Sequence, residues 1–335
     1  MQEDTAQPII SAPLPRAEDM ADATPLAATS PPVAANRISR TTRVWGGLIG
    51  CMGSFLLGIV VLGGVAGAFA VNLYREPPVT SDTTQTLDVT GPQHLVVHGS
   101  AGDVQINAGS DNAMTVEVKK SARAISQSVA RQLLDAMHVS ITQSGNVVTV
   151  QEQDANFITF FSEQQVNLII TAPAQTNLTD SLSAGNLTVI GFTGQLNLDN
   201  SAGNISLHDV TINGVSRIHE SAGNIDLTGQ MATGASLDVQ ESAGNISFTA
   251  SLATNNRLTF GNSAGDINLH LPQATDAQIK AQSSAGNITI HGWPIDVSQE
   301  FAAASASGNT SSDPNPSNTI TISESAGNIS IAAQG

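Results

Sequence analysis

The 335-residue chain has very little cysteine and few cations. Its one cysteine, Cys51, cannot form a disulfide within the chain, so folds that depend on disulfide bonds are excluded. Lysine and arginine together number 12 against 28 acidic residues, which gives a formal net charge of −16. Because phosphates and anionic lipid headgroups are bound by clustered cations, this balance argues against nucleic acid and lipid headgroups as partners.

Charged residues of both signs are also scarce, at 12% of the chain, and aromatic residues make up only 4%. Glycine, serine, threonine and asparagine supply the polarity instead, which is typical of a turn-rich β protein. A surface platform of aromatic rings for stacking sugars is therefore not expected.

The N-terminal part lacks large apolar residues, and the part after it lacks charge. Residues 1–43 contain many prolines among alanine and threonine, so we expect a disordered tail. Residues 44–71 carry no charge and exceed the roughly 20 residues that span a bilayer, so we expect one transmembrane helix over 44–73 and a linker over 74–84. Basic residues precede the span and predict a cytoplasmic N-terminus and an extracytoplasmic domain over 85–335. They are Arg37, Arg40 and Arg43.

Two motifs leave alternatives to a retained membrane helix. Residues 68–70, Ala-Phe-Ala, resemble a signal-peptidase site, but a signal peptide has an apolar core of only about 7–15 residues. Residues 48–51, Leu-Ile-Gly-Cys, resemble a lipidation motif, but most of the apolar run follows the cysteine. Small residues recur every four positions in the span, and such a stripe predicts self-association of the helix. They are Gly46, Gly50, Ser54 and Gly58.

The tetrapeptide Ser-Ala-Gly-Asn/Asp recurs through the rest of the chain. Its copies begin at Ser100, Ser183, Ser201, Ser221, Ser242, Ser263, Ser284 and Ser325. From the second copy on, most steps are 18 to 21 residues, and a fixed period near 20 indicates a stacked array. The last step is about twice as long, and residues 306–309, Ala-Ser-Gly-Asn, fall near its middle and resemble a decayed copy.

Each repeat predicts two short strands joined by this turn. The positions four and six residues after the serine are apolar in every copy, with a polar residue between them. The positions five and three before it are apolar in nearly every copy, and this alternation is that of half-buried strands. Identical columns in successive repeats favour a parallel β-solenoid with two-strand rungs; antiparallel hairpins are the alternative. The glycine can take a positive φ at no steric cost, and the asparagine or aspartate can bond nearby backbone or stack on its counterpart in the next rung.

Two segments interrupt the repeat. Within residues 107–180 we expect strands at 114–118, 147–150 and 166–170, and a helix at 121–137 that covers the open end of the solenoid. Residues 292–319 are interpreted as a long loop. The predicted fold class is all-β: a parallel β-solenoid with rungs of about 20 residues and one capping helix, preceded by the transmembrane helix.

The order of these motifs resembles the bacterial putative-adhesin domain family, a family of unknown function. The resemblance is carried by residues 94–106, the helix, residues 166–173 and the Gly-Asn turns from Thr176 onward, and it covers roughly 85–335. It implies a β-solenoid-like envelope domain, often carried by membrane-anchored chains, and a bacterial plasma-membrane location. It implies no catalytic residue and no cofactor.

Four residues are candidates for metal binding. His270 and His291 both lie seven residues after a turn serine, so adjacent rungs would bring the imidazoles within about 5 Å of each other. No third ligand is evident, and zinc usually has three or four, so we favour a solvated surface pair. Asp103 and Asp266 replace asparagine in the turn, where isolated calcium sites stay possible.

Three glutamates directly precede a turn serine: Glu220, Glu241 and Glu324. A carboxylate pair is the minimum for glycoside hydrolysis. We interpret these positions as outward-facing, where neighbouring carboxylates would only repel mildly. No catalytic residue, metal or cofactor is therefore predicted.

Two classes of function follow. The first is a non-enzymatic, membrane-anchored module that acts structurally or adhesively at the cell envelope through its sheet faces. The second is a single-pass sensor in which the outer domain detects a ligand or envelope stress and the N-terminal tail reports it.

Overall fold

The computed structural model describes residues 77–153 and 162–335, all of them within one compact unit. No helix among these residues is long and apolar enough to cross a membrane. The predicted tail, the transmembrane helix over 44–73 and its stripe of small residues lie outside the described residues.

The described chain forms two twelve-stranded sheets, named sheet A and sheet B here. In sheet A the strands lie in the order β1 (Val79–Asp88), β4 (Ala113–Arg123), β7 (Glu163–Pro173), β3 (Val104–Gly109), β9 (Leu187–Ile190), β12 (Gly203–Ile212), β14 (Gly223–Met231), β16 (Gly244–Leu252), β18 (Ile267–Pro272), β24 (Ile329–Gln334) and β20 (Ile288–His291), with β10 (Thr193–Gly194) beside β12. In sheet B the order is β21 (Val297–Glu300), β22 (Ala303–Asn309), β19 (Ala277–Ser283), β23 (Asn318–Ala326), β17 (Arg257–Ala264), β15 (Ser236–Glu241), β13 (Val215–Glu220), β11 (Leu196–Asn200), β8 (Thr176–Ala184), β2 (Gln93–Ala101), β6 (Val147–Gln153) and β5 (His138–Ser144).

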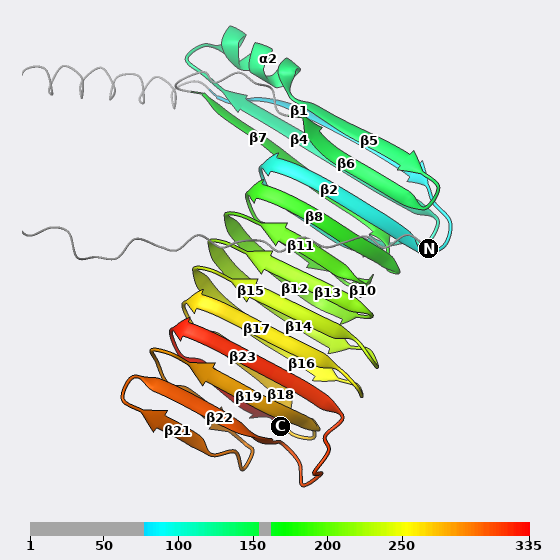
Figure 1. Ribbon diagram of the computed structural model, residues 1–335. Coiled ribbons are helices and arrows are strands. Elements are labelled where there is room, and N and C mark those ends of the chain that lie inside the picture. Colours follow the sequence, from blue (N-terminus) through cyan, green and yellow to red (C-terminus); the bar gives the residue numbers. More distant parts are fainter. Residues whose placement is uncertain (1–76, 154–161) are drawn as a thin grey trace, which may run out of the picture. The chain divides into compact units, whose positions relative to one another are not determined.

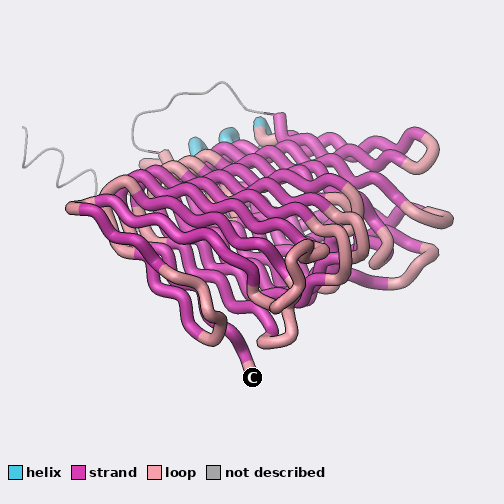
Figure 2. The backbone as a smooth tube through the Cα atoms, turned by 60° about the horizontal axis from the view of Figure 1, so that its bottom comes forward, coloured by secondary structure: helices cyan, strands magenta, loops and turns pink. Residues whose placement is uncertain are grey.

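Each of the Ser-Ala-Gly-Asn/Asp turns joins a strand of sheet B to a strand of sheet A, so one turn and its two strands form a rung (Figure 1). Neighbouring rungs pair in parallel and in register: Ile225 of β14 pairs with Ile205 of β12 on one side and Ile246 of β16 on the other. The parallel pairing confirms the solenoid and excludes the hairpin alternative. Figure 2 shows the strands of both sheets running side by side, with the loops gathered at their ends.

The predicted apolar columns form the core between the sheets. Ile246 and Phe248 of β16 are each 1% exposed, whereas Ser247 between them faces outward and is partly exposed. Phe248 also contacts Phe260 of sheet B edge-to-face, with ring centroids 5.1 Å apart. The period-two pattern therefore assigned the inward and outward faces of these strands correctly.

The spatial order of the rungs differs from their order in the sequence. The last rung, β23 and β24, lies between the rung of β17 and β18 and the rung of β19 and β20. The prediction of a long loop over 292–319 is wrong, because β21 and β22 form an antiparallel hairpin that extends sheet B beyond β19. Residues 306–309 belong to β22 and its end rather than to a decayed turn.

The predicted interruption after the first rung is confirmed in outline. Strands β4, β6 and β7 occupy the expected places. The helix α2 (Gln127–Ala136) is shorter than the expected 121–137, because β4 continues to Arg123. It begins after the N-cap Ser126, whose Oγ accepts a hydrogen bond from the Val129 backbone N–H. The helix buries Leu133 and Leu134 and contacts β4 and β1 at the end of sheet A. The segment predicted as a linker is shorter than expected, because β1 begins at Val79.

The turn glycines are required mainly because adjacent rungs approach closely. The turn glycines can take a positive φ, and Gly203 has one, at +139°. Gly223 and Gly244 do not, yet a Cβ on Gly244 would lie 1.4 Å from the carbonyl oxygen of Gly223 in the next rung. The steric requirement therefore comes from the neighbouring backbone, and φ adds to it only at some rungs.

We expect Ile246→Asp to destabilise the domain far more than Ser247→Asp. The first places an unpaired carboxylate in the core, which costs several kcal/mol, whereas the second adds a charge to an outward column that already holds Asp226. Thermal unfolding followed by circular dichroism measures the difference. Equal midpoints for the two variants would contradict the assignment of the strand faces.

Candidate functional site

One long edge of the stack carries a ladder of asparagine side chains. In a typical step, the backbone N–H and the side-chain Nδ2 of Asn224 donate to Oδ1 of Asn204, at 3.0 and 3.1 Å. In spatial order the ladder runs through Asn167, Asp103, Asn186, Asn204, Asn224, Asn245, Asp266, Asn328, Asn287 and Gln299. The sequence left two roles open for the turn asparagine, a bond to nearby backbone or stacking on its counterpart; the structure shows Oδ1 accepting from both the backbone N–H and the side chain of the next rung.

The two aspartates belong to this ladder. Oδ1 of Asp103 accepts from the backbone N–H and Nδ2 of Asn186, and Oδ1 of Asp266 accepts in the same way from Asn328. Neither lies in a group of three or more potential metal-ligating side chains within 77–153 and 162–335. Hydrogen bonding in the ladder therefore accounts for both carboxylates.

A second polar column lies just inside this edge, on the sheet B strands. Its members are 0 to 5% exposed and in spatial order are Asn200, Glu220, Glu241, Asn262, Glu324 and Ser283. The prediction that the glutamates face outward is wrong. The residues five and three positions before each turn serine face the core. By the same period of two, the residue directly before the serine also faces the core. The inward position of the glutamates could therefore have been predicted from the sequence.

Side chains of the buried column form hydrogen bonds with the backbone of the turns. Oε1 of Glu220, Glu241 and Glu324 accepts the backbone N–H of the alanine two residues later, at 3.1 to 3.2 Å. Asn262 makes a second bond, in which its Nδ2 donates to the Gly244 carbonyl of the adjacent rung at 2.9 Å. Asn200 and Ser283 donate to turn-glycine carbonyls in the same manner.

A glutamate can make that second bond only when it is protonated. The Oε2 atoms of Glu220, Glu241 and Glu324 are buried and have no partner in the described structure. Burial raises the pKa of Glu220 to about 6, although the Ala222 N–H, the Asn200 side chain and the Ser221 N–H act to lower it. Burial raises the pKa of Glu241 to about 7, and the charge of Glu220 contributes to that rise. Burial likewise raises the pKa of Glu324.

One more carboxyl group is buried in the apolar core. Asp180 of β8 lies between Val97 of β2 and Leu198 of β11, is 1% exposed, and neither of its oxygens has a partner in the described structure. Burial, with a smaller contribution from the charge of Asp199, raises its pKa to about 8. At neutral pH the group is therefore largely uncharged, which limits the cost of its burial.

The two histidines do not form a pair. His270 of β18 and His291 of β20 are both aligned with Ala332 of β24, which lies between them. The expected distance of about 5 Å between the imidazoles is wrong, because the last rung is inserted between theirs. No group of potential metal ligands includes them in the part of the chain that the structure describes.

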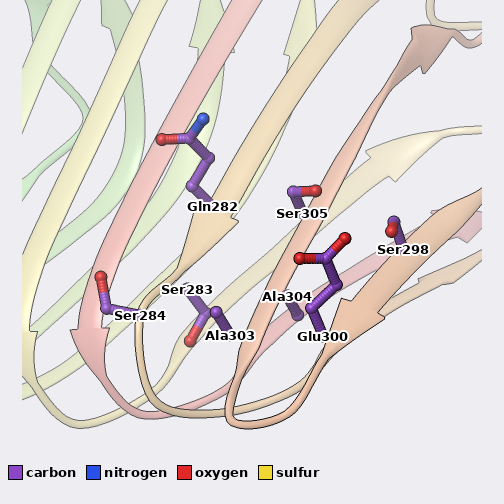
Figure 3. Close-up of a pocket in the computed structure, with 8 residues that line it drawn as sticks. All are labelled: Gln282, Ser283, Ser284, Ser298, Glu300, Ala303, Ala304 and Ser305. Atoms are coloured by element: carbon purple, nitrogen blue, oxygen red, sulfur yellow. The ribbon is translucent and has the colours of Figure 1, made fainter.

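A concave polar surface lies at the β21–β22 end of sheet B. Two adjoining hollows of about 320 and 340 Å³ share Gln282, Ser298 and Ser305 and form what we call the end groove. Lys280, Asp296 and Glu300 add the charged groups of its lining. Figure 3 shows part of this lining on neighbouring strands. The sequence interpretation missed the groove because it treated 292–319 as a loop.

The comparisons with known proteins concern the whole domain. The family described as Toastrack DUF4097 matches residues 93–251 and 193–332. No curated protein matches the chain. A solved structure of a putative cell adhesion protein from Clostridium sporogenes covers 76% of this chain and 100% of its own, with 10% identity and a TM-score of 0.38. A putative adhesin from Bacteroides fragilis covers 75% and 96%, with 12% identity and a TM-score of 0.34. A putative lipid binding protein from Parabacteroides distasonis covers 75% and 97%, with 12% identity and a TM-score of 0.30.

We expect the domain to lose stability as the pH rises from 5 to 8. The pKa values of Glu220 and Glu241 are raised from 4.5 to about 6 and about 7, so their contribution is complete below about pH 4.5 and is lost as the pH passes through these values. In the double variant Glu220→Gln/Glu241→Gln, the amides keep the acceptor oxygen and can donate as Asn262 does. Thermal midpoints across this pH range should then change less, and the variant should be the more stable protein at pH 8.

The matched control is Asp226→Asn, an exposed acid in an outward column. Its pH dependence should equal that of the native domain. A double variant that retains the native slope would show that the buried column does not govern the pH response.

Proposed function

Because the chain belongs to the Toastrack DUF4097 family, we propose that it is a membrane-anchored, non-enzymatic β-solenoid module that binds a hydroxyl-rich polymer of the cell envelope. The observation that carries this proposal is the end groove. Its lining consists of serines, alanines, one glutamine, one lysine and two acids, which suits a ligand recognised through hydroxyl and amide groups.

The position of the groove supports presentation away from the membrane. Strand β1, which follows the predicted transmembrane segment, lies at one end of sheet A, and the other strands at this end include β4 and β7. The end groove lies at β19, β21 and β22, at the opposite end of the rung order. In chain order, an anchor before β1 would thus join the stack at the end opposite the end groove.

A hydrolytic role for the glutamates has little geometric support. Glu220 and Glu241 are 0 and 3% exposed, and each uses Oε1 to bind its own turn. A glycoside hydrolase needs two carboxyl groups that reach the bond on either side of a substrate. These two side chains point into the core, so a polymer on the outer surface would not reach them.

The experiment is cosedimentation of the purified domain with peptidoglycan and with a panel of insoluble polysaccharides. We expect the native domain to be retained by at least one polymer, and the double variant Gln282→Ala/Glu300→Ala to bind it about tenfold more weakly. The estimate follows from the loss of two hydrogen bonds at about 0.5–1.5 kcal/mol each.

Thr149→Ala is the control, because Thr149 lies in β6, between buried Val148 and Val150 and far from the groove in strand order. It should bind as the native domain does. Retention of no polymer by the native domain would contradict the binding role, and equal retention of the groove variant would place the binding surface elsewhere.

A further inference from the structure

The last rung in the sequence lies between two rungs that follow each other directly in the sequence. Strand β23 pairs in parallel with β17 on one side and with β19 on the other, and β24 pairs in the same way with β18 and β20. The rungs of β17–β18 and β19–β20 nevertheless belong to consecutive turns, which begin at Ser263 and Ser284. We call the rung of β23 and β24, residues 318–334, the inserted rung, and the two rungs beside it the flanking rungs.

The flanking rungs match each other as well as they match the inserted rung. In sheet A, Ile329 of the inserted rung is aligned with Ile267 on one side and Ile288 on the other. The equivalent sheet B column consists of Leu258, Ile320 and Ile279. Direct pairing of the flanking rungs would therefore place apolar residues beside apolar residues, in the register that the other rungs use.

The contacts between turns would also be preserved. A Cβ on Gly327 would meet the Gly265 carbonyl oxygen, and a Cβ on Gly286 would meet the Gly327 carbonyl oxygen, so both glycines approach the rung before them equally closely. Asn328 and Asn287 occupy successive steps of the asparagine ladder. In a stack without the inserted rung, Gly286 and Asn287 can therefore take the places of Gly327 and Asn328.

The connection between the flanking rungs is long enough for direct pairing. Four residues, 273–276, join β18 to β19 past the inserted rung. Four residues, 253–256, also join β16 to β17, although there the step leads to the neighbouring rung. The same number of residues thus crosses two strand spacings, about 9.6 Å, in the first case and one spacing, about 4.8 Å, in the second. Direct pairing would shorten the path of the chain.

Hydrogen bonds at the start of the inserted rung fasten it in place. The Asp276 carboxylate accepts from Ser311 Oγ at 2.6 Å and from the Ser317 backbone N–H at 2.9 Å. Asn318 Nδ2 donates to the Asp276 carbonyl, and Asn318 Oδ1 accepts from the Asn256 N–H, both at 2.8 Å. Four isoleucines of the rung are also buried: Ile320, Ile322, Ile329 and Ile331. These contacts make the filled stack the more stable arrangement of the native chain.

One side chain of the inserted rung opposes its burial. Glu324 is 3% exposed, and its Oε2 has no partner in the part of the chain that the structure describes. In the buried polar column Glu324 lies between Asn262 and Ser283, which are both uncharged. Direct pairing would place these two side chains next to each other and would remove the carboxyl group from the column.

We propose that the inserted rung is an exchangeable element of the stack and that the flanking rungs pair directly when it is displaced. The domain then has two packed arrangements, one filled and one closed. Closure brings β19, β21 and β22, which carry the end groove, one rung nearer to β17. It also releases the inserted rung as a segment whose strand edges are free to pair elsewhere. The inference does not depend on polymer binding.

Disulfide mapping within the full-length chain distinguishes the two arrangements. Cys51 is the one native cysteine, so Cys51→Ser gives a cysteine-free background. Asn268 and Thr289 are both aligned with Ser330, which lies between them, so about 9.6 Å separates their Cα atoms in the filled stack. A disulfide needs Cα atoms within about 7 Å of each other. We therefore expect Asn268→Cys/Thr289→Cys to stay reduced under mild oxidation in the native stack and to crosslink in the closed one.

A pair of charges displaces the inserted rung without shortening the chain. Ile329→Asp/Ile331→Asp puts two carboxylates at core positions, so the rung can no longer be buried. We expect this variant to raise the disulfide yield of the 268/289 pair about tenfold or more, as the Cα distance falls within reach. The matched control is Ser330→Asp, at the outward position between the two isoleucines, which should leave the pair reduced. The yield is measured by alkylation of the remaining thiols.

A second cysteine pair reports whether the rest of the stack stays folded. Ser247 and Asn268 are direct partners on β16 and β18, so Ser247→Cys/Asn268→Cys should crosslink in both arrangements. A displaced variant that crosslinks at 247/268 but not at 268/289 would overturn the proposal. Loss of both crosslinks would overturn it equally, because the flanking rungs would then not stack without the inserted rung. An equal 268/289 yield in the Ser330→Asp control would also contradict it.

Discussion

The close approach of turn glycines in adjacent rungs is the constraint on which the rest of the structure depends. The backbone of Gly244 leaves no space for a Cβ beside the Gly223 carbonyl, and Gly223 stands in the same relation to Gly203. This contact sets the register in which the sheet strands pair. The asparagine ladder on the outside and the buried polar column on the inside both follow from it, because each is built from side chains at equivalent positions of successive rungs.

The sequence predicted the rungs well because the repeat carried its own register. Columns such as Ile205, Ile225 and Ile246 showed which residues face the core, and the structure pairs them directly. The spatial order of the rungs was not predictable in the same way, since rungs with equivalent columns can replace one another in a stack. The false pairing of His270 with His291 results from this ambiguity.

The buried glutamates show a different limit of sequence reasoning. The period-two alternation predicts that these glutamates face the core, whereas their charge favours exposure to solvent. The interpretation of the sequence followed the charge. The structure resolves the conflict through pKa values raised by burial and through the alanine N–H groups that each carboxyl binds. The end groove was hidden for a further reason, since it is built by a hairpin without the repeat motif. Apart from Ser283, which bonds the Gly327 carbonyl and also lines the groove, the residues that support stacking are thus separate from those that we propose bind a polymer.

The central claim is that rung-to-rung contact at the glycines, rather than φ alone, holds the stack in register. Comparison of Gly244→Ala with Gly234→Ala by thermal and denaturant unfolding tests it most directly. Gly234 has a φ of +75° and open space around its Cβ position, so alanine there should cost only about 1–2 kcal/mol of backbone strain. Gly244→Ala should cost more than about 4 kcal/mol or prevent folding. Equal, small losses for the two variants would contradict the account.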